Sequence, residues 1–335
     1  MTLDLPLIWA GLIAFAVLAY VILDGFDLGI GILFPLFREE RERDRLMNSV
    51  APVWDGNETW LVLGGGGLMA AFPLAYSVVL PALYAPLIAM LLGLVFRGVA
   101  FEFRWRTRRW KRVWDYSFAL GSLVATLMQG IALGGLIQGI RVAGRVYAGG
   151  WWDWLTPFSI LTGVALVIGY ALLGAAWLIL KTDGEIQDRC YLLAHRLGIL
   201  LVAMIGIVSL WTPFLDARFL ARWFHGPNVF FTAPMPLLVL GAACLLWHGL
   251  HVRNHEVQPF LATLALFVLS YAGLGISFWP MMVPPAISIR DAAAPDASLG
   301  FLLVGAVILL PVILAYTTYA YRVFRGKVAD HAGYH

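Results

Sequence analysis

The sequence predicts an all-α membrane protein whose helices cross the bilayer about nine times. Of its 335 residues, 61% are hydrophobic and 13% are charged, whereas a soluble domain carries about 25% charged residues. The apolar residues also gather into windows of about 20, the length at which a helix spans the hydrocarbon core of a bilayer. We therefore expect a single polytopic membrane domain over residues 1–335, built from helix bundles.

The expected helices follow one another with short polar loops between them. The first has no basic segment before it and is too long for the apolar core of a signal peptide, so we interpret it as a membrane span. The windows cover residues 7–34, 50–75, 78–103, 117–140, 157–181, 196–214, 230–251, 258–280 and 299–321.

The basic residues predict the orientation of the bundle. If the N-terminus lies outside the cell, the inner loops and the C-terminal tail hold 17 of the 23 Lys and Arg residues, and the outer loops hold five. Because short cytoplasmic loops carry the excess of Lys and Arg, we expect the N-terminus outside and the C-terminus in the cytoplasm. The net charge of +3 is small and spread over these loops, so a nucleic-acid partner is not expected.

Besides Glu102, which falls near the membrane surface, five charged residues lie inside the first three expected spans. They are Asp24 and Asp27 in the first span, Asp55 and Glu58 in the second, and Arg97 in the third. At a rise of about 1.5 Å per residue, all five fall roughly 6 to 12 Å to the cytoplasmic side of the bilayer midplane. A charge at the centre of a spanning helix costs about 2.5 to 3.5 kcal/mol on insertion scales. We therefore expect these side chains to meet in the protein interior.

Two interpretations of this polar layer stay open. Four carboxylates share one guanidinium, so some of them could hold and pass protons near neutral pH along a path from the cytoplasm. Alternatively, a buried network completed by Asn57 and Thr59 locks the three helices together. The run Gly64–Gly67 lies in the middle of a span without a following Lys-Ser or Lys-Thr. We expect it to let helices pack closely rather than to bind a phosphate.

Haem or metal ligation by this chain is not expected. A b-type haem in a helical membrane subunit takes axial His or Met ligands from within the spans, whereas the histidines lie at helix ends, in loops or in the tail. His248, His251 and His255 have a spacing of three and four residues, which at a helix end is more typical of a solvated cap than of a metal site. If the chain takes part in electron transfer, a partner supplies the iron.

Six long motifs occur in order along nearly the whole chain. They are LDGFDLGIGILFP (residues 23–35), NSVAPVWDGNETWL (48–61), FRGVAFEFR (96–104), WLTPF (154–158), GYALLGAAWLILKTDGEIQ (169–187) and WPMMVPPAISIRDAAAP (279–295). In these motifs and their spacing, the sequence resembles subunit II of the cytochrome bd-type quinol oxidases. The segment APVWDGNETWLVLGGGG (51–67) is most similar to the cyanide-insensitive branch.

The resemblance implies a reaction and a set of partners. Such enzymes oxidise quinol and reduce dioxygen to water in the bacterial inner membrane, taking protons from the cytoplasm and building proton-motive force without pumping. Subunit I would hold two b-type haems and haem d and would oxidise the quinol, and this chain would be its nine-helix partner in the lipid. The resemblance also allows for small single-helix subunits and for a bound structural quinone, whose pocket the sequence does not locate.

The resemblance also implies roles for individual residues. Asp55 of the WDGN motif would relay protons from the cytoplasm towards the haems. Asp27 and Arg97 match other buried polar positions of the family. Our hypothesis is that Asp24 and Asp27 extend this path and that Arg97 sets their proton affinity. Glu58, which directly follows WDGN, joins the path by its position in the sequence.

Trp60 is a further candidate site residue, and two other functions of the chain stay open. Trp60 matches a tryptophan near the mouth of an oxygen tunnel, with an ordinary lipid-facing tryptophan as the alternative. The chain could instead act only as a structural scaffold for subunit I, or as a stand-alone proton-coupled transporter. The absence of paired, Gly- or Pro-broken helices in two related halves of the sequence argues against the transporter.

Overall fold

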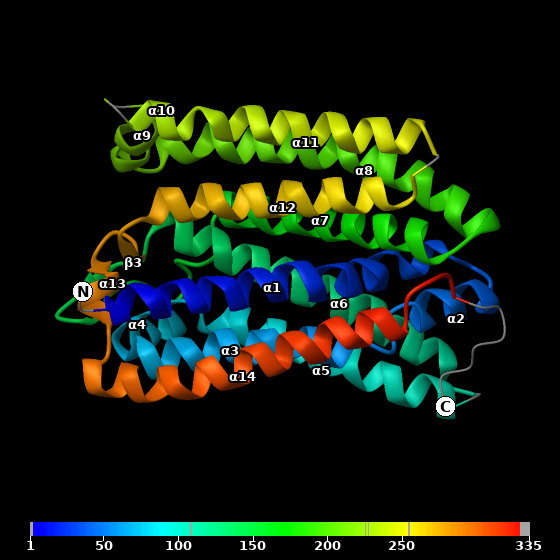
Figure 1. Cartoon of the computed structure of the whole chain (residues 1–335), viewed down its shortest axis with the longest axis horizontal. Helices are drawn as coiled ribbons and strands as arrows, with labels where there is room; N and C mark the ends of the chain where they lie inside the picture. The colour runs from blue at the N-terminus through cyan, green and yellow to red at the C-terminus, as the bar shows by residue number, and fades with distance from the viewer. Residues whose placement is uncertain (1–2, 108, 225, 227, 254, 329–335) are drawn as a thin grey trace.

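The computed structural model describes all residues except 1–2, 108, 225, 227, 254 and 329–335. In this described part, nine long helices run along the bundle and place the two ends of the chain at its opposite ends (Figure 1). We call these the N-terminal end and the C-terminal end of the bundle. The long helices are α1 (Leu5–Leu33), α3 (Trp54–Ala71), α5 (Tyr84–Arg106), α6 (Lys111–Gln138), α7 (Pro157–Lys181), α8 (Gly184–Trp211), α11 (Pro234–His251), α12 (Val257–Phe278) and α14 (Asp296–Val323).

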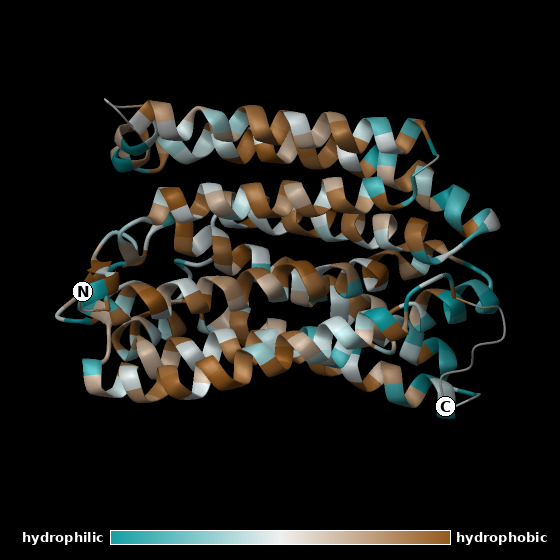
Figure 2. Cartoon of the chain, viewed as in Figure 1, coloured by the Kyte–Doolittle hydropathy of each residue, from teal (hydrophilic) through white to brown (hydrophobic). Residues whose placement is uncertain are grey.

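Eight of these helices are long and apolar enough to cross a membrane, judged over the described residues. The ninth, α3, has 18 residues, and its polar first turns and four consecutive glycines lower its hydropathy. Figure 2 shows apolar residues along the middle of the bundle and polar residues gathered at its two ends. The expected all-α polytopic fold is therefore confirmed, and which end faces the cytoplasm stays a prediction.

Most helix boundaries fall within a few residues of the predicted ones. α7 covers residues 157–181, as expected from the sequence. Two helices begin well before the expected residue: α6 starts at Lys111 rather than at 117, and α8 starts at Gly184 rather than at 196. In both cases polar residues continue the helix beyond the apolar window, so hydropathy alone places the start too late.

The second and third expected spans are divided differently in the structure. α3 ends at Ala71, a short helix α4 (Pro73–Ala82) follows, and α5 begins at Tyr84. Proline has no backbone N–H and disfavours helical geometry in the residue before it. Pro73 therefore ends α3 and begins α4, which turns the chain at the N-terminal end of the bundle (Figure 1).

Short elements connect the long helices at both ends. At the C-terminal end, η1 (Phe34–Leu36) and α2 (Glu40–Asn48) join α1 to α3 (Figure 1). The other connections include two antiparallel hairpins, formed by β1 (Val142–Ala143) with β2 (Val146–Tyr147) and by β3 (Met281–Val283) with β4 (Ile287–Ser288). They also include four short helices: η2 (Thr212–Phe214), α9 (Ala217–Phe224), α10 (Asn228–Thr232) and α13 (Ile289–Ala292).

A close crossing of α1 and α7 organises the core. A β-carbon on Gly29 would lie 1.8 Å from the carbonyl oxygen of Tyr170, and one on Gly174 would lie 2.5 Å from the carbonyl carbon of Gly29. The two backbones therefore touch, which only glycine permits at these positions. Beside the crossing, the rings of Phe26 and Trp177 stack with centroids 4.3 Å apart. As a result, α1 is buried on all sides from residue 24 to residue 31.

Candidate functional site

Arg97 lies at the centre of a buried polar cluster formed by α1, α3 and α5. Its Nη1 donates to Asp24 Oδ1 at 2.6 Å, and its Nη2 donates to Glu58 Oε2 at 2.5 Å. The Arg97 and Asp24 side chains are fully buried, whereas the Glu58 side chain is 29% exposed. The guanidinium carbon also lies 5.7 Å from the ring centroid of Trp54, a cation–π contact. One guanidinium thus joins the three helices, as the sequence predicts.

A second set of polar side chains lies beside this ion pair. Asn57 Nδ2 donates to Asp27 Oδ2 at 2.8 Å and to the Leu23 carbonyl oxygen at 3.3 Å, and the Tyr321 hydroxyl donates to Asn57 Oδ1 at 2.9 Å. Asp27 lies three residues after Asp24 on α1, so the two carboxylates are neighbours on that helix. Because Tyr321 belongs to α14, the polar cluster reaches a fourth helix that the sequence analysis did not include.

Several buried polar atoms of the cluster form no hydrogen bond with a described residue. Asp24 Oδ2, Asp27 Oδ1, Arg97 Nε and the Tyr20 hydroxyl have no hydrogen-bond partner within the described residues. Since buried polar atoms are normally paired with protein or ordered water, these atoms have unused capacity to donate or accept. These atoms are the ones that an ordered water molecule would satisfy, while the ion pairs bind the helices together.

Asp55 lies apart from the Arg97 cluster, contrary to expectation. It is exposed in the first turn of α3, and its carboxylate makes no ion pair or hydrogen bond with another described residue. Side chains two residues apart on a helix point in nearly opposite directions, so Asp55 faces outward because Asn57 faces the cluster. Thr59 also faces outward, and its hydroxyl donates to the Asp55 carbonyl oxygen at 2.8 Å. The prediction that Asp55 meets Arg97, and that Thr59 completes the network, is wrong for this chain.

The outward-facing residues of α3 form a continuous surface, which we call the open face of α3. Gly65 and Gly66 belong to it, and a β-carbon on either would meet no atom within 4 Å. Gly64 and Gly67 point the other way, where a β-carbon would lie 3.2 Å from a side chain of α1. The glycine run therefore allows close helix packing inside this chain at two of its four positions. The open face consists of Asp55, Gly56, Thr59, Val62, Gly65, Gly66, Met69 and Ala70.

Trp60 is buried rather than facing lipid. Its side chain is among the largest fully buried ones, in a cluster with Ala16 and Tyr20 of α1. Its ring meets Phe15 edge to face with centroids 5.7 Å apart, and its Nε1 has no partner among the described residues. The alternative of an ordinary lipid-facing tryptophan is therefore wrong, and the role at an oxygen tunnel stays a prediction.

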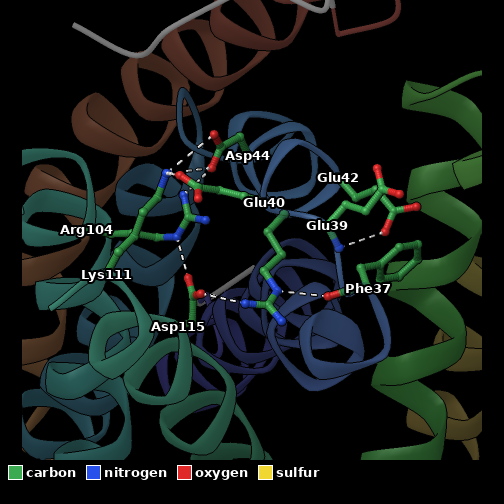
Figure 3. Close-up of polar contacts among 9 residues, drawn as sticks. Phe37, Glu39, Glu40, Glu42, Asp44, Arg104, Lys111 and Asp115 are labelled. Atoms are coloured by element: carbon green, nitrogen blue, oxygen red, sulfur yellow. Dashed lines mark hydrogen bonds and ion pairs between the residues drawn. The ribbon is translucent and has the colours of Figure 1, made fainter. Parts of the chain in front are cut away.

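A second charged network, which the sequence analysis missed, lies at the C-terminal end of the bundle (Figure 3). Arg104 is fully buried, and it donates to Asp115 Oδ1 and to Asp44 Oδ1, each at 2.6 Å. Arg43 Nη1 donates to Asp115 Oδ2 at 2.8 Å. Lys111 Nζ lies 2.5 Å from Glu40 Oε1 and 3.3 Å from Asp44 Oδ1. The network ties α2 to the facing ends of α5 and α6.

Two sequence signals could have revealed this network. Arg104 follows Arg97 by seven residues, a spacing that puts both on one face of α5. Asp115 was left outside the spans because the fourth helix was expected to begin at residue 117, whereas α6 begins at Lys111. An acidic residue in the first turns of a spanning helix, opposite an arginine at the end of the preceding one, predicts an ion pair.

Comparisons with known proteins agree with this architecture. The family profile described as "Cytochrome bd terminal oxidase subunit II" matches residues 5–324. "Cytochrome bd ubiquinol oxidase subunit 2" of Bacillus subtilis (strain 168) is 30% identical over 334 residues, covering 96% of each chain. "Cytochrome bd-I ubiquinol oxidase subunit 2" of Escherichia coli (strain K12) is 28% identical over 363 residues, covering 97% of this chain and 95% of that protein.

A solved structure shows the same fold. "The structure of bd oxidase from Geobacillus thermodenitrificans" contains a chain that matches with a TM-score of 0.74 at 18% sequence identity, covering 96% of this chain and 99% of that chain. The family profile matches nearly the whole of this chain, and the sequence match extends over nearly the whole length of the two relatives. The chain therefore belongs to the family of subunit II of the cytochrome bd terminal oxidases.

Proposed function

We propose that this chain supports the haem-bearing subunit I of a quinol-oxidising, dioxygen-reducing oxidase in the bacterial inner membrane and conducts protons to it from the cytoplasm. Membership of the subunit II family supports the partnership with subunit I. The observation that carries the proton route is the chain of polar side chains around Arg97. Reduction of dioxygen to water consumes protons, and these reach a centre buried in lipid only through polar groups and water.

The proposed route begins at Asp55 on the open face of α3. Glu58 neighbours Asp55 because it lies three residues further along the same helix. Its carboxylate is partly exposed and also contacts Arg97. Asp24 continues the route behind Arg97, and Asp27 extends it towards Asn57. The carboxylates can accept and release protons, whereas Arg97 stays protonated and supplies the fixed positive charge. The unpartnered carboxylate oxygens are where ordered water would complete the path.

We place subunit I against the open face of α3. An unpaired carboxylate that faced lipid would be costly, whereas the same group at a protein boundary can find polar partners or water. Small residues on the face would let a helix of subunit I approach closely. Asp55 would then lie at the subunit boundary, where a proton from the cytoplasm could enter the route. The orientation follows from the predicted excess of basic residues in the inner loops, which puts the C-terminal end of the bundle in the cytoplasm.

Three histidines of the described chain support a subunit II that supplies no haem ligand. His248 and His251 lie in the last turn of α11, where His248 contacts Gln258, and the His251 ring lies 5.4 Å from that of His195. His195 also packs against Trp247. His195 lies inside α8 rather than at a helix end as expected, because α8 begins at Gly184, but its ring contacts put it level with the end of α11. Imidazoles at this end of the bundle do not fit the axial ligation of a haem within the spans. We propose that subunit I holds both b-type haems and haem d. The cyanide-insensitive branch, any small single-helix subunits and a structural quinone stay predictions.

A purely structural scaffold is the second candidate function, and one observation favours it. Arg97 is fully buried and bonds to two helices besides its own, so the cluster would bind α1, α3 and α5 together even if no proton passed through it. The two candidates differ in their prediction for Asp55, because its carboxylate makes no ion pair or hydrogen bond with a described residue that could support the fold. The transporter alternative has no observation of its own in its favour.

Replacing Asp55 by Asn distinguishes the two functions in the purified oxidase complex. A relay predicts normal subunit and haem content with oxygen consumption slowed at least about tenfold, since a positioned proton-transfer group typically contributes about 100-fold or more. Asp27→Asn should act similarly, because the new amide oxygen can still accept from Asn57. Glu102→Gln is the matched control, since Glu102 is an exposed acid on α5 whose only ion pair in the described chain is with Arg106. Unchanged turnover in Asp55→Asn, or loss of haem instead of rate, would remove Asp55 from a relay.

A further inference from the structure

A basic pocket lies beside the second charged network, at the C-terminal end of the bundle. It has a volume of about 520 Å³ and lies between α2, the end of α5 and the start of α6. Its lining contains one carboxylate and four cations, whose side chains come from Glu40, Arg104, Arg109, Lys111 and Arg112, together with the ring of Trp105.

Two buried donors on residues that line this pocket have no hydrogen-bond partner within the described chain. Arg104 uses Nε for Asp115 and Nη1 for Asp44, whereas its Nη2 has no hydrogen-bond partner within the described chain (Figure 3). Trp105 Nε1, likewise buried, is also without a partner among these residues. A buried donor left unsatisfied costs about 1 to 3 kcal/mol, and more when the group is charged. Both donors belong to residues that line the pocket, so an acceptor bound there would lie beside groups that the described chain leaves unpaired.

The charges around the pocket favour an anion. Asp44 and Asp115 neutralise much of the charge of Arg104, and Glu40 pairs with Lys111. Arg109 and Arg112 are exposed, and neither makes an ion pair with any described residue. Two guanidinium groups thus remain free to bind an anion at the pocket rim, above the Trp105 ring that packs beneath Arg104 and Lys111. Guanidinium groups bind phosphate through paired charge-assisted hydrogen bonds.

The surface next to the pocket is apolar. Arg112, Tyr116 and Leu120 are spaced by four residues and lie on one exposed face of α6, so an apolar strip begins one turn below the rim. Phe103 and Val113 are exposed near the same helix ends. Cations at the end of a spanning helix, followed by exposed apolar side chains, match a molecule with a phosphate headgroup and acyl chains.

We propose that this pocket binds a phosphate group, and that the group is the headgroup of an anionic phospholipid of the adjacent leaflet. Arg109 and Arg112 bind the phosphate at the rim, and Arg104 Nη2 and Trp105 Nε1 donate to its oxygens from below. The acyl chains lie along the apolar strip of α6. The charged network and the pocket together contain more positive than negative side chains, so the negative charge of the bound lipid strengthens the connection between α2, α5 and α6. The five cations are Arg43, Arg104, Arg109, Lys111 and Arg112, and the three carboxylates are Glu40, Asp44 and Asp115.

Native mass spectrometry of the delipidated oxidase complex tests this site. The complex is titrated with dioleoyl phosphatidylglycerol, with zwitterionic dioleoyl phosphatidylcholine and, in a separate arm, with inorganic phosphate as competitor. Arg109→Gln combined with Arg112→Gln should weaken phosphatidylglycerol binding about thirtyfold, because each cation near a membrane surface contributes about a factor of five. Trp105→Phe keeps an aromatic ring but removes its donor, and should weaken binding several-fold.

The control is Arg322→Gln with Arg325→Gln, two exposed cations at the same end of the bundle, which should leave binding unchanged.

The outcomes separate the sources of the phosphate. Pocket-dependent binding of phosphatidylglycerol that millimolar inorganic phosphate does not displace supports the lipid. Pocket-dependent displacement by inorganic phosphate supports the phosphate site but assigns it to a soluble anion. Equal binding of the anionic and the zwitterionic lipid, or equal losses in the pocket and control variants, would overturn the proposal. The exposed positions of Arg109 and Arg112 keep the test independent of folding.

Discussion

Removing one partner of the Asp24–Arg97 ion pair should destabilise the chain far more than its loss of contacts suggests. Both side chains are fully buried, and the bond between them is 2.6 Å long. Arg97→Gln removes the positive charge but leaves Asp24 in the interior next to Glu58, with Asp27 three residues away on α1. Breaking a buried pair in this way costs about 3 to 5 kcal/mol, because an uncompensated charge remains.

Adding Asp24→Asn to Arg97→Gln should recover part of the stability that Arg97→Gln alone loses. Asp24→Asn alone leaves Arg97 paired with Glu58, so we expect a smaller loss of about 1 to 3 kcal/mol. In the double variant no uncompensated charge of this pair remains, and the total cost should fall below the sum of the two by about 2 kcal/mol. The exposed pair Arg253–Asp188, whose side chains are 50% and 65% exposed, should show a coupling below about 1 kcal/mol.

Reversible unfolding in mixed micelles measures these free energies for the four proteins of each cycle. The reasoning requires a large coupling for the buried pair and a small one for the exposed pair. If the effects of Arg97→Gln and Asp24→Asn add to within about 0.5 kcal/mol, the two residues are energetically independent and the cluster described here does not hold the helices together.

Three further substitutions have distinct expected outcomes. Gly29→Ala should prevent the α1–α7 crossing, since its β-carbon would lie 1.8 Å from a backbone oxygen, whereas Gly241→Ala in α11 meets no atom within 4 Å; the yield of folded protein should fall only for the first. Tyr321→Phe removes one hydrogen bond to Asn57 and should lower the free energy of unfolding by about 1 kcal/mol, and an unchanged value would exclude α14 from the network. Lys181→Met removes the donor to the carbonyl oxygens of Phe324 and Gly326, so limited proteolysis should cut the segment after α14 faster; an unchanged cleavage rate would contradict this role.

The sequence predicts the long helices well because each is marked by a property that acts locally. A window of about 20 apolar residues marks the part of a helix that lies in the hydrocarbon core. α7 matches its predicted bounds. Hydropathy fails where a helix continues into water, as at the start of α6 and α8, and where proline divides an apolar stretch, as at Pro73. The two short hairpins carry too few residues for a clear alternating pattern, although Gly144 and Arg145 have the positive φ angles of a tight hairpin turn.

The candidate site is predicted only as far as helix depth determines it. Depth along the helix places Asp24, Glu58 and Arg97 at one level, and their ion pairs confirm that level. The direction in which a side chain points around the helix axis depends on how the helix is rotated in the bundle. Asp55 has the right depth but faces outward because Asn57, two residues later, faces α1. That rotation depends on contacts with other helices, which a single sequence does not show.

Proton uptake by the oxidase in proteoliposomes tests the central proposal most directly. The fully reduced complex is mixed with dioxygen, and a pH-sensitive dye reports protons taken from the compartment that faces the C-terminal end of the bundle. The proposal predicts uptake from that compartment, slowed at least about tenfold by Asp55→Asn while electron transfer to the haems begins at the normal rate. Uptake from the opposite compartment, or at an unchanged rate in the variant, would contradict it.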